Sequence, residues 1–462
     1  MKKTLLALCC VSSLVFGTDD MDSLFDESFE DTEFLVEEPK KEKKSYNLTF
    51  NGFIKVRGYG FVNPTDVENQ DTNLYHSDTI LELNTKFKKD SYIVSGSVFG
   101  LIGTDSDTYE YDKLLNEPRD NDKKMVVAGI KELYAIKSAD NYDIVAGKKM
   151  FNPGISTLYS PSDVYNTKLS PDPLDPYTIG TLLVKTEYYL DNSSYALVLF
   201  PYISTSKTAS MKTRWGGDGE DVVVNSFTVD DAAKVTKDEE NKVRALFTSK
   251  FNTILYNQGI DLLFSVGYGP SIYSVLEYTN TPNLYLETNP KAMYIDTGFS
   301  TTYKKFELHA EVYYQSVFKD KDDDFISAVG GVTYTLDKFV DKVGFKKIDM
   351  TVEYVKETIT NHYDKELTYR SSEKTRAPKN DVLINMMAQI NDKWNLTYFG
   401  NFRLEVEQEK DSGRYQKIAS TYKSANGINT TLFVELFNGD VNSYYGKWRN
   451  NDRVGIDLKY SF

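Results

Sequence analysis

The stretch RVGIDLKYSF, residues 453–462, alternates with a period of two over its whole length. One set of positions is apolar and ends in aromatic rings: Val454, Ile456, Leu458, Tyr460 and Phe462. The intervening set is small, polar or charged: Arg453, Gly455, Asp457, Lys459 and Ser461. Because successive side chains of a β-strand point to opposite sides, this pattern predicts a strand with one apolar and one polar face.

The same alternation recurs along the chain, for example in residues 48–57, 305–315, 347–356 and 394–407. We count about eighteen such segments between residues 45 and 462, and sixteen stays open because segment boundaries shift by several residues. Short turns and longer polar loops tend to follow one another between them. This arrangement predicts an all-β protein, a transmembrane antiparallel up-and-down β-barrel over residues 45–462 with long external loops.

Composition agrees with a membrane barrel. The chain has 34 Tyr and 26 Phe but only two Cys and three His. No apolar run approaches the ~18 residues that a membrane-spanning helix needs. The apolar residues of a membrane barrel alternate with polar ones, so such a chain can cross a membrane although its mean hydropathy is polar. A secreted β-sandwich or β-solenoid is the alternative that composition alone leaves open.

The N-terminus, residues 1–17, reads as an export signal peptide. Lys2 and Lys3 precede a short apolar run from Leu5 to Phe16. A lipid anchor on Cys9 or Cys10 is the weaker alternative, because Leu8 or Cys9 would then occupy the position before the lipidated cysteine, where a small residue is needed. Cleavage would remove both cysteines, and with them any disulfide or thiol site. Losing the two lysines takes the net charge from −14 to −16, which argues against a nucleic-acid partner.

Residues 18–44 form an acidic leader that we expect on the periplasmic side. This composition predicts a disordered tail. Met21, Leu24, Phe25 and Phe29 fall at helical spacing, so a short amphipathic helix that docks on a partner or enters the barrel is the alternative.

The final strand resembles the C-terminal signal of Gram-negative outer-membrane proteins, and the chain resembles porin-type barrels. The resemblance implies an outer-membrane location, contact with outer-membrane lipids, and recognition by the barrel-assembly machinery through the strand that ends in Phe462. A homo-oligomer is also compatible with this resemblance.

A barrel of sixteen to eighteen strands encloses water, so charged inward positions predict a channel for passive diffusion of small hydrophilic solutes. The predicted pore-lining residues are Lys55, Arg57, Lys185, Glu187, Glu307, Glu311, Asp349, Glu353, Arg403, Glu405, Arg453, Asp457 and Lys459. Mutual pairing that stiffens the wall is the alternative role for them. A structural or adhesive envelope protein, and less favoured an outer-membrane hydrolase, are the alternative functions.

Nothing in the sequence indicates an enzyme, a cofactor or a metal. His76, His309 and His362 are far apart, and no nucleophile, zinc or phosphate motif occurs. Acidic clusters at 105–112 and 320–324 lack the spacing of a calcium loop, so they are interpreted as solvated loop surface.

The third long connection, FNPGISTLYSPSDVYNTKLSPDPLDP (residues 151–176), contains five of the 13 prolines. In general porins the third external loop narrows the channel, so its position makes this segment resemble a constriction loop. Proline fixes φ and removes a backbone donor, which disfavours an extra strand and lowers the cost of ordering. The candidate residues in it are Asp163, Asp172, Asp175, Tyr159 and Tyr165. A rigid loop covering the barrel mouth is the alternative.

Overall fold

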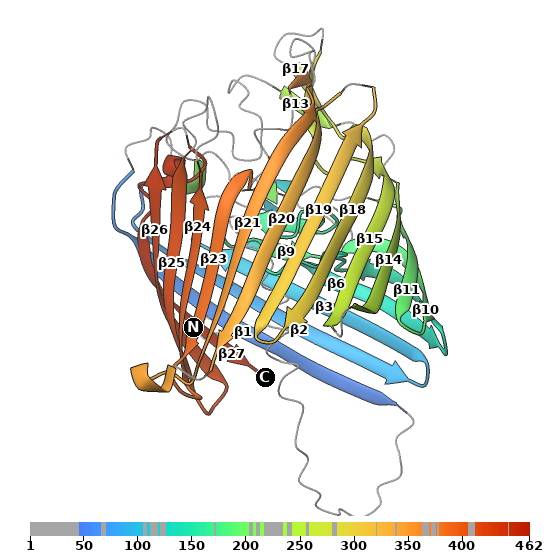
Figure 1. Cartoon of the computed structure of the whole chain (residues 1–462). Helices are drawn as coiled ribbons and strands as arrows, with labels where there is room; N and C mark the ends of the chain where they lie inside the picture. The colour runs from blue at the N-terminus through green and yellow to red at the C-terminus, as the bar shows by residue number, and fades with distance from the viewer. Residues whose placement is uncertain are drawn as a thin grey trace, which may run out of the picture.

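The computed structural model is a closed antiparallel β-barrel of 18 strands (Figure 1). It describes residues 46–462 except 66–70, 105–108, 111–118, 121–125, 171, 203–206, 209–212, 217–233, 238–242, 256–257, 280–283, 320, 338–339, 363–368, 371–375, 377, 405–411 and 442. The predicted signal peptide and acidic leader lie outside the described residues. The predicted fold class and the count of about eighteen strands are confirmed.

Each barrel strand pairs with the next barrel strand along the chain. In order around the barrel they are β1 (Asn47–Phe61), β2 (Tyr75–Lys89), β3 (Tyr92–Gly103), β6 (Val126–Ala139), β7 (Tyr142–Lys149), β10 (Thr181–Leu190), β11 (Ser193–Phe200), β14 (Arg244–Leu255), β15 (Gln258–Pro270), β18 (Lys291–Tyr303), β19 (Phe306–Val317), β20 (Asp324–Leu336), β21 (Lys347–Asn361), β23 (Asn380–Gln389), β24 (Trp394–Arg403), β25 (Gly413–Lys423), β26 (Ile428–Gly439) and β27 (Arg453–Ser461).

The last strand closes the barrel against the first. β27 pairs antiparallel with β1 from Phe53↔Ser461 to Phe61↔Arg453. Beyond β27, the backbones of Gly52 and Phe462 exchange two hydrogen bonds of 2.9 and 3.0 Å. A Cβ atom at Gly52 would lie 2.5 Å from the backbone oxygen of Glu82 and 3.0 Å from the Phe462 ring, so a glycine is needed where these two neighbours approach.

Alternation separates the two faces of the wall. On β27 the outer Val454 is 55% exposed, whereas the neighbouring Arg453 is fully buried. Apolar outer side chains with this exposure continue around the barrel, for example Leu432, Leu197 and Phe264. Every backbone group of a closed barrel is paired, so the outer face can contact lipid without leaving polar groups unsatisfied.

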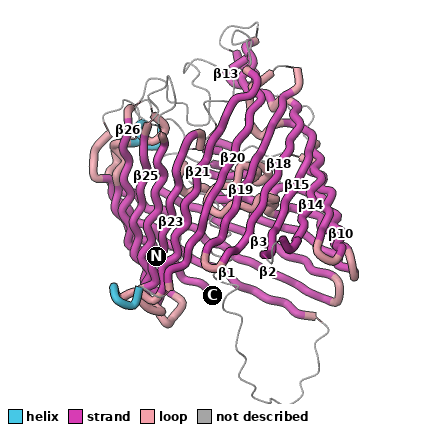
Figure 2. Tube along the Cα trace, viewed as in Figure 1, coloured by secondary structure: helices cyan, strands magenta, loops and turns pink. Residues whose placement is uncertain are grey.

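The connections differ at the two ends of the barrel (Figure 2). One end carries short turns, of which several place a residue at positive φ, such as Asp90, Asp191 and Lys304. The C-terminus lies at this end (Figure 1). The other end carries the long loops, three of which contribute β13 (Lys234–Lys237), β16 (Val275–Tyr278), β17 (Leu284–Thr288) and β22 (Tyr369–Arg370) to a small separate sheet.

The remaining elements are short. They are β4 (Tyr109–Glu110), β5 (Arg119–Asp120), β8 (Thr167–Ser170), β9 (Tyr177–Ile179), β12 (Lys207–Thr208) and the 3₁₀ turns η2 (Arg214–Gly216), η3 (Val340–Val343) and η5 (Gly446–Trp448). Within the described part of the chain, no helix has the length and apolar character needed to cross a membrane.

Candidate functional site

The connection between β7 and β10, residues 150–180, folds into the lumen of the barrel. Its side chains join three separate buried clusters on the inner wall. Leu158 and Leu174 pack with residues of β1 and β20–β26, and Tyr165 packs with residues of β7–β20. Leu169 packs against β2, β3 and β6. One segment that contacts all sides of the wall must cross the interior, and we call it the lumen loop.

Glu353 on β21 binds the backbone of the lumen loop. Its carboxylate accepts hydrogen bonds from the N–H groups of Thr157, Leu158 and Tyr159, at 3.0, 2.7 and 2.9 Å. The Nε2 atom of His309 lies 2.7 Å from the same carboxylate. The side chains of Glu353 and His309 are both fully buried. A buried carboxylate needs such donors to offset its lost hydration.

Glu311 on β19 binds the same loop on both sides of this contact. One oxygen accepts the N–H groups of Ile155 and Ser156 at 2.9 and 3.1 Å. The other accepts the Ser160 hydroxyl at 2.8 Å and both the N–H and the hydroxyl of Ser162 at 3.1 and 2.8 Å. Two wall carboxylates therefore satisfy six backbone donors of a segment that has no strand partner there.

Glycines on the wall make room for these contacts. Gly331 on β20 lies between His309 and Glu353 in the strand register. A Cβ atom at Gly331 would lie 2.6 Å from the Glu353 Cγ and closer still to the His309 ring. A Cβ at Gly298 on β18 would lie 2.7 Å from the Ile155 side chain. Small residues at these two positions let the carboxylates reach across and the lumen loop approach.

We expect Gly331→Val to displace His309 and Glu353 and to loosen the lumen loop. Gly330→Val is the matched control, because a Cβ at that outward glycine meets nothing within 4 Å. Single-channel recording should show larger and noisier current for Gly331→Val than for Gly330→Val. Equal currents for the two variants would show that the space at Gly331 is not needed to hold the lumen loop.

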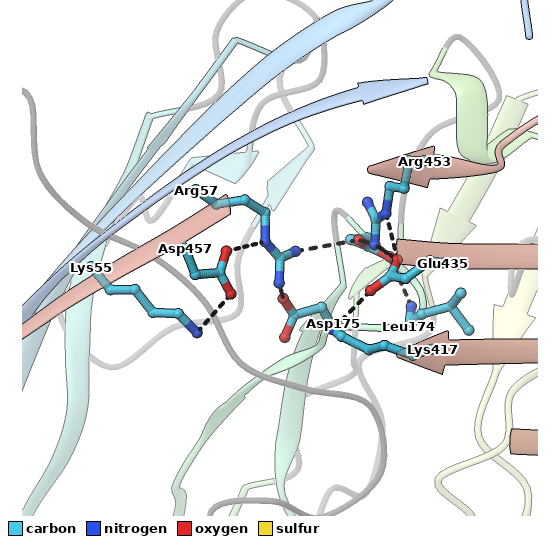
Figure 3. A network of polar contacts seen from close by, with 9 residues as sticks. Lys55, Arg57, Leu174, Asp175, Lys417, Glu435, Arg453 and Asp457 are labelled. Atoms are coloured by element: carbon cyan, nitrogen blue, oxygen red, sulfur yellow. Dashed lines mark hydrogen bonds and ion pairs between the residues drawn. The ribbon is translucent and has the colours of Figure 1, made fainter. Parts of the chain in front are cut away.

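On the other side of the lumen, the loop is fastened by ion pairs (Figure 3). Arg57 contacts Asp175 at 2.6 Å and Asp457 at 3.0 Å. Arg453 contacts Asp172 at 2.6 Å and also pairs with Glu435. Two loop carboxylates are thus held by two wall arginines on β1 and β27.

Further pairs extend this network along the wall. Lys417 lies 2.8 Å from Glu435, and Lys55 lies 3.6 Å from Asp457. Burial raises the pKa of Asp172 above its ordinary value, and the adjacent Arg453 opposes that rise. Buried charges of this kind are stable only when paired, so these ion pairs hold the lumen loop in one position against the wall.

The predicted pore-lining residues do not all join these contacts. Lys185 pairs with Glu187 at 2.5 Å, Asp349 pairs with Lys347 at 2.8 Å, and Arg403 pairs with Asp381 at 3.2 Å. Glu307 is exposed near a turn, and Lys459 lies 4.8 Å over the Phe53 ring. Glu405 lies outside the described residues.

The candidate residues of the loop divide in the same way. Asp172 and Asp175 contact wall arginines, whereas Asp163 pairs within the loop with Lys168 at 2.6 Å. Tyr165 stacks on Phe200 at 5.1 Å, and Tyr159 packs beside the first buried cluster.

Several residues of the site were absent from the sequence-based set. They are Glu82, Lys131, Asp381, Lys417 and Glu435. Lys131 contacts Glu82 at 3.2 Å, and the hydroxyl of Tyr177 in the loop donates to Glu82 at 2.7 Å. The alternation of β2 and β26 would have placed Glu82 and Glu435 on the inner face.

Two adjoining cavities lie beneath the start of the lumen loop, facing the turn end. The larger, about 550 Å³, is bounded by Gly154 and Ile155 of the loop and by the wall from β10 to β18. The smaller, about 220 Å³, lies against β7, β10, β11 and β14. Both are lined by Pro153, Ser194 and Lys250.

No protein-family model and no curated protein sequence matches this chain. Three solved structures that are similar to it are proteins of Pseudomonas aeruginosa. OccK9 (OpdG) has a TM-score of 0.49 at 8% identity and covers 90% of this chain and 98% of its own. OccK5 (OpdH) has 0.48 at 8%, covering 89% and 97%. The outer membrane protein OpdK has 0.47 at 8%, covering 90% and 98%.

Proposed function

We propose that this protein is an outer-membrane channel for passive diffusion of small hydrophilic solutes. The observation that carries the proposal is a closed 18-stranded wall with an apolar outer face and a charged interior. Barrels of this size enclose an aqueous lumen, and the apolar outer face suits a lipid bilayer. Transport then needs no energy source, because the solute moves down its gradient.

The lumen loop is the constriction of this channel in our proposal. It lies inside the wall and is held by Glu311 and Glu353 on one side and by Arg57 and Arg453 on the other. Such a loop reduces the free cross-section, so solutes would be selected by size and by the charges that remain unpaired.

We infer that the strand ending in Phe462 serves as the assembly signal. The inference is supported by the exposed apolar residues of β27 and by its pairing with β1, which closes the barrel. Deleting Phe462 should lower the yield of folded barrel in the outer membrane.

Planar-bilayer recording tests the channel itself. Purified protein should give stepwise ohmic current, and proteoliposomes should swell in small sugars but not in large oligosaccharides. A folded barrel that carries no current would refute the open-channel function and favour a structural or adhesive role for the long loops.

A further inference from the structure

The charges of the lumen are divided between two sides of the barrel. Arg57, Arg453, Asp172, Asp175 and Glu435 all lie in ion pairs on the side of β1, β26 and β27. Their charges are compensated over a few ångströms, and their positions are fixed by the loop. Compensated pairs contribute little field at a distance, so this side is poorly suited to sort ions.

The two cavities lie on the opposite side of the strand order, beside β10, β11, β14 and β15. Three lysines line the smaller one. The Lys185 ammonium is neutralised by Glu187 at 2.5 Å. Lys149 lies with its ammonium 4.5 Å over the Tyr134 ring. Both are engaged by the wall.

Lys250 on β14 differs from them. Its side chain is exposed and lines both cavities. Among the residues that the structure describes, no carboxylate lies within ion-pair distance of its ammonium. Its strand neighbours are Ser194 and Leu263. Two carboxylates, Asp191 and Asp261, line the larger cavity toward the turn end. The only carboxylate among the described residues that line the smaller cavity is Glu187, which is paired with Lys185, so the smaller cavity is the positively charged one.

We propose that these cavities form a binding subsite for a small solute whose anionic group lies in the smaller cavity, with Lys250 as its selectivity-determining residue. A combined space of this order accepts a small organic molecule. A cation that forms no ion pair, beside a narrow passage, raises the local concentration of anions and repels cations. The solute passage therefore runs off-centre, along the β10–β15 wall. This inference rests on the proposed channel function.

Charge reversal tests the assignment. Lys250→Glu should lower the chloride-to-potassium permeability ratio several-fold, measured from the reversal potential in a KCl gradient. Lys423→Glu is the matched control, because Lys423 is an exposed lysine at the turn end of β25, nearly opposite β14. Equal shifts in the two variants would overturn the subsite while leaving the channel function intact. Absence of current in the unaltered protein would instead overturn the channel function.

Cysteine chemistry gives a second test that does not depend on comparing separately folded variants. Both cysteines of the chain are Cys9 and Cys10, so residues 18–462 contain none. A Lys250→Cys channel should lose anion preference and regain it when a cationic methanethiosulfonate restores the positive charge. An anionic reagent should shift preference further toward cations. A channel whose selectivity is unchanged by either reagent, with labelling verified by mass, would refute the role of Lys250.

Discussion

Replacing residues 155–174 with a short Gly-Ser linker is expected to raise single-channel conductance several-fold. This segment supplies the backbone groups bound by Glu311 and Glu353 and the Asp172 carboxylate bound by Arg453. Without it the wall remains complete, because none of the 18 barrel strands lies between Lys149 and Thr181. Water would fill the vacated interior and solvate the released charges.

The deletion should also relax the size limit for sugars in liposome swelling. Folded protein must first be verified by its resistance to unfolding in detergent on a gel. Unchanged conductance in a folded deletion variant would mean that the loop does not limit the current, and would contradict the constriction.

The double variant Glu311→Gln with Glu353→Gln, which removes the two wall carboxylates that bind the lumen loop, is expected to free residues 155–162 while the barrel stays closed. An amide turns half of each acceptor into a donor, which then faces the N–H groups of the loop. Hydrogen bonds to a charged group contribute about 1.5–3 kcal/mol each, so losing several should release residues 155–162, while the ion pairs of Asp172 and Asp175 still hold the far end of the loop. Current should become larger and should flicker as the loop moves.

Proteolysis measures the release of the lumen loop without relying on channel current. Lys168 in the loop is only partly exposed, and trypsin should cleave there faster in the double variant. Asp392→Asn is the control, because this exposed turn carboxylate forms an ion pair with Lys346 that does not involve the loop. A double variant with the conductance and cleavage rate of Asp392→Asn would show that the carboxylates do not hold the loop.

Alternation was sufficient to predict the wall. The faces of RVGIDLKYSF, with Val454 outward and Arg453 inward, are those found in β27. The reason is physical: a closed sheet between lipid and a polar interior leaves each position only one suitable face, and the two-residue period records it. Turn chemistry such as the positive-φ Asp191 then fixed where the strands reverse.

The partners inside the lumen could not be predicted in this way. The alternation puts Glu311 and Lys185 on the same face, yet one binds the loop and the other binds Glu187. Whether an inward charge binds the loop or another wall residue depends on where the lumen loop crosses the lumen. It also depends on the absence of a side chain at Gly331. Neither feature appears in the two-residue alternation of the sequence. Apart from the closure between β1 and β27, strand pairing is local in sequence, whereas these contacts are not.

The contacts of the lumen loop also bear on how the barrel folds. Thr157 and the Glu353 carboxylate that binds it are separated by 196 residues. Asp172 binds Arg453, which belongs to β27, the last of the 18 barrel strands along the chain. Contacts across so long a stretch of chain form late, because closing the intervening loop costs entropy. Closing the wall between β1 and β27 joins residues even farther apart in the chain, from Phe53↔Ser461 to Phe61↔Arg453. We therefore expect the barrel to close and its interior to be filled in the same late stage of folding, because both need the first and last strands to meet.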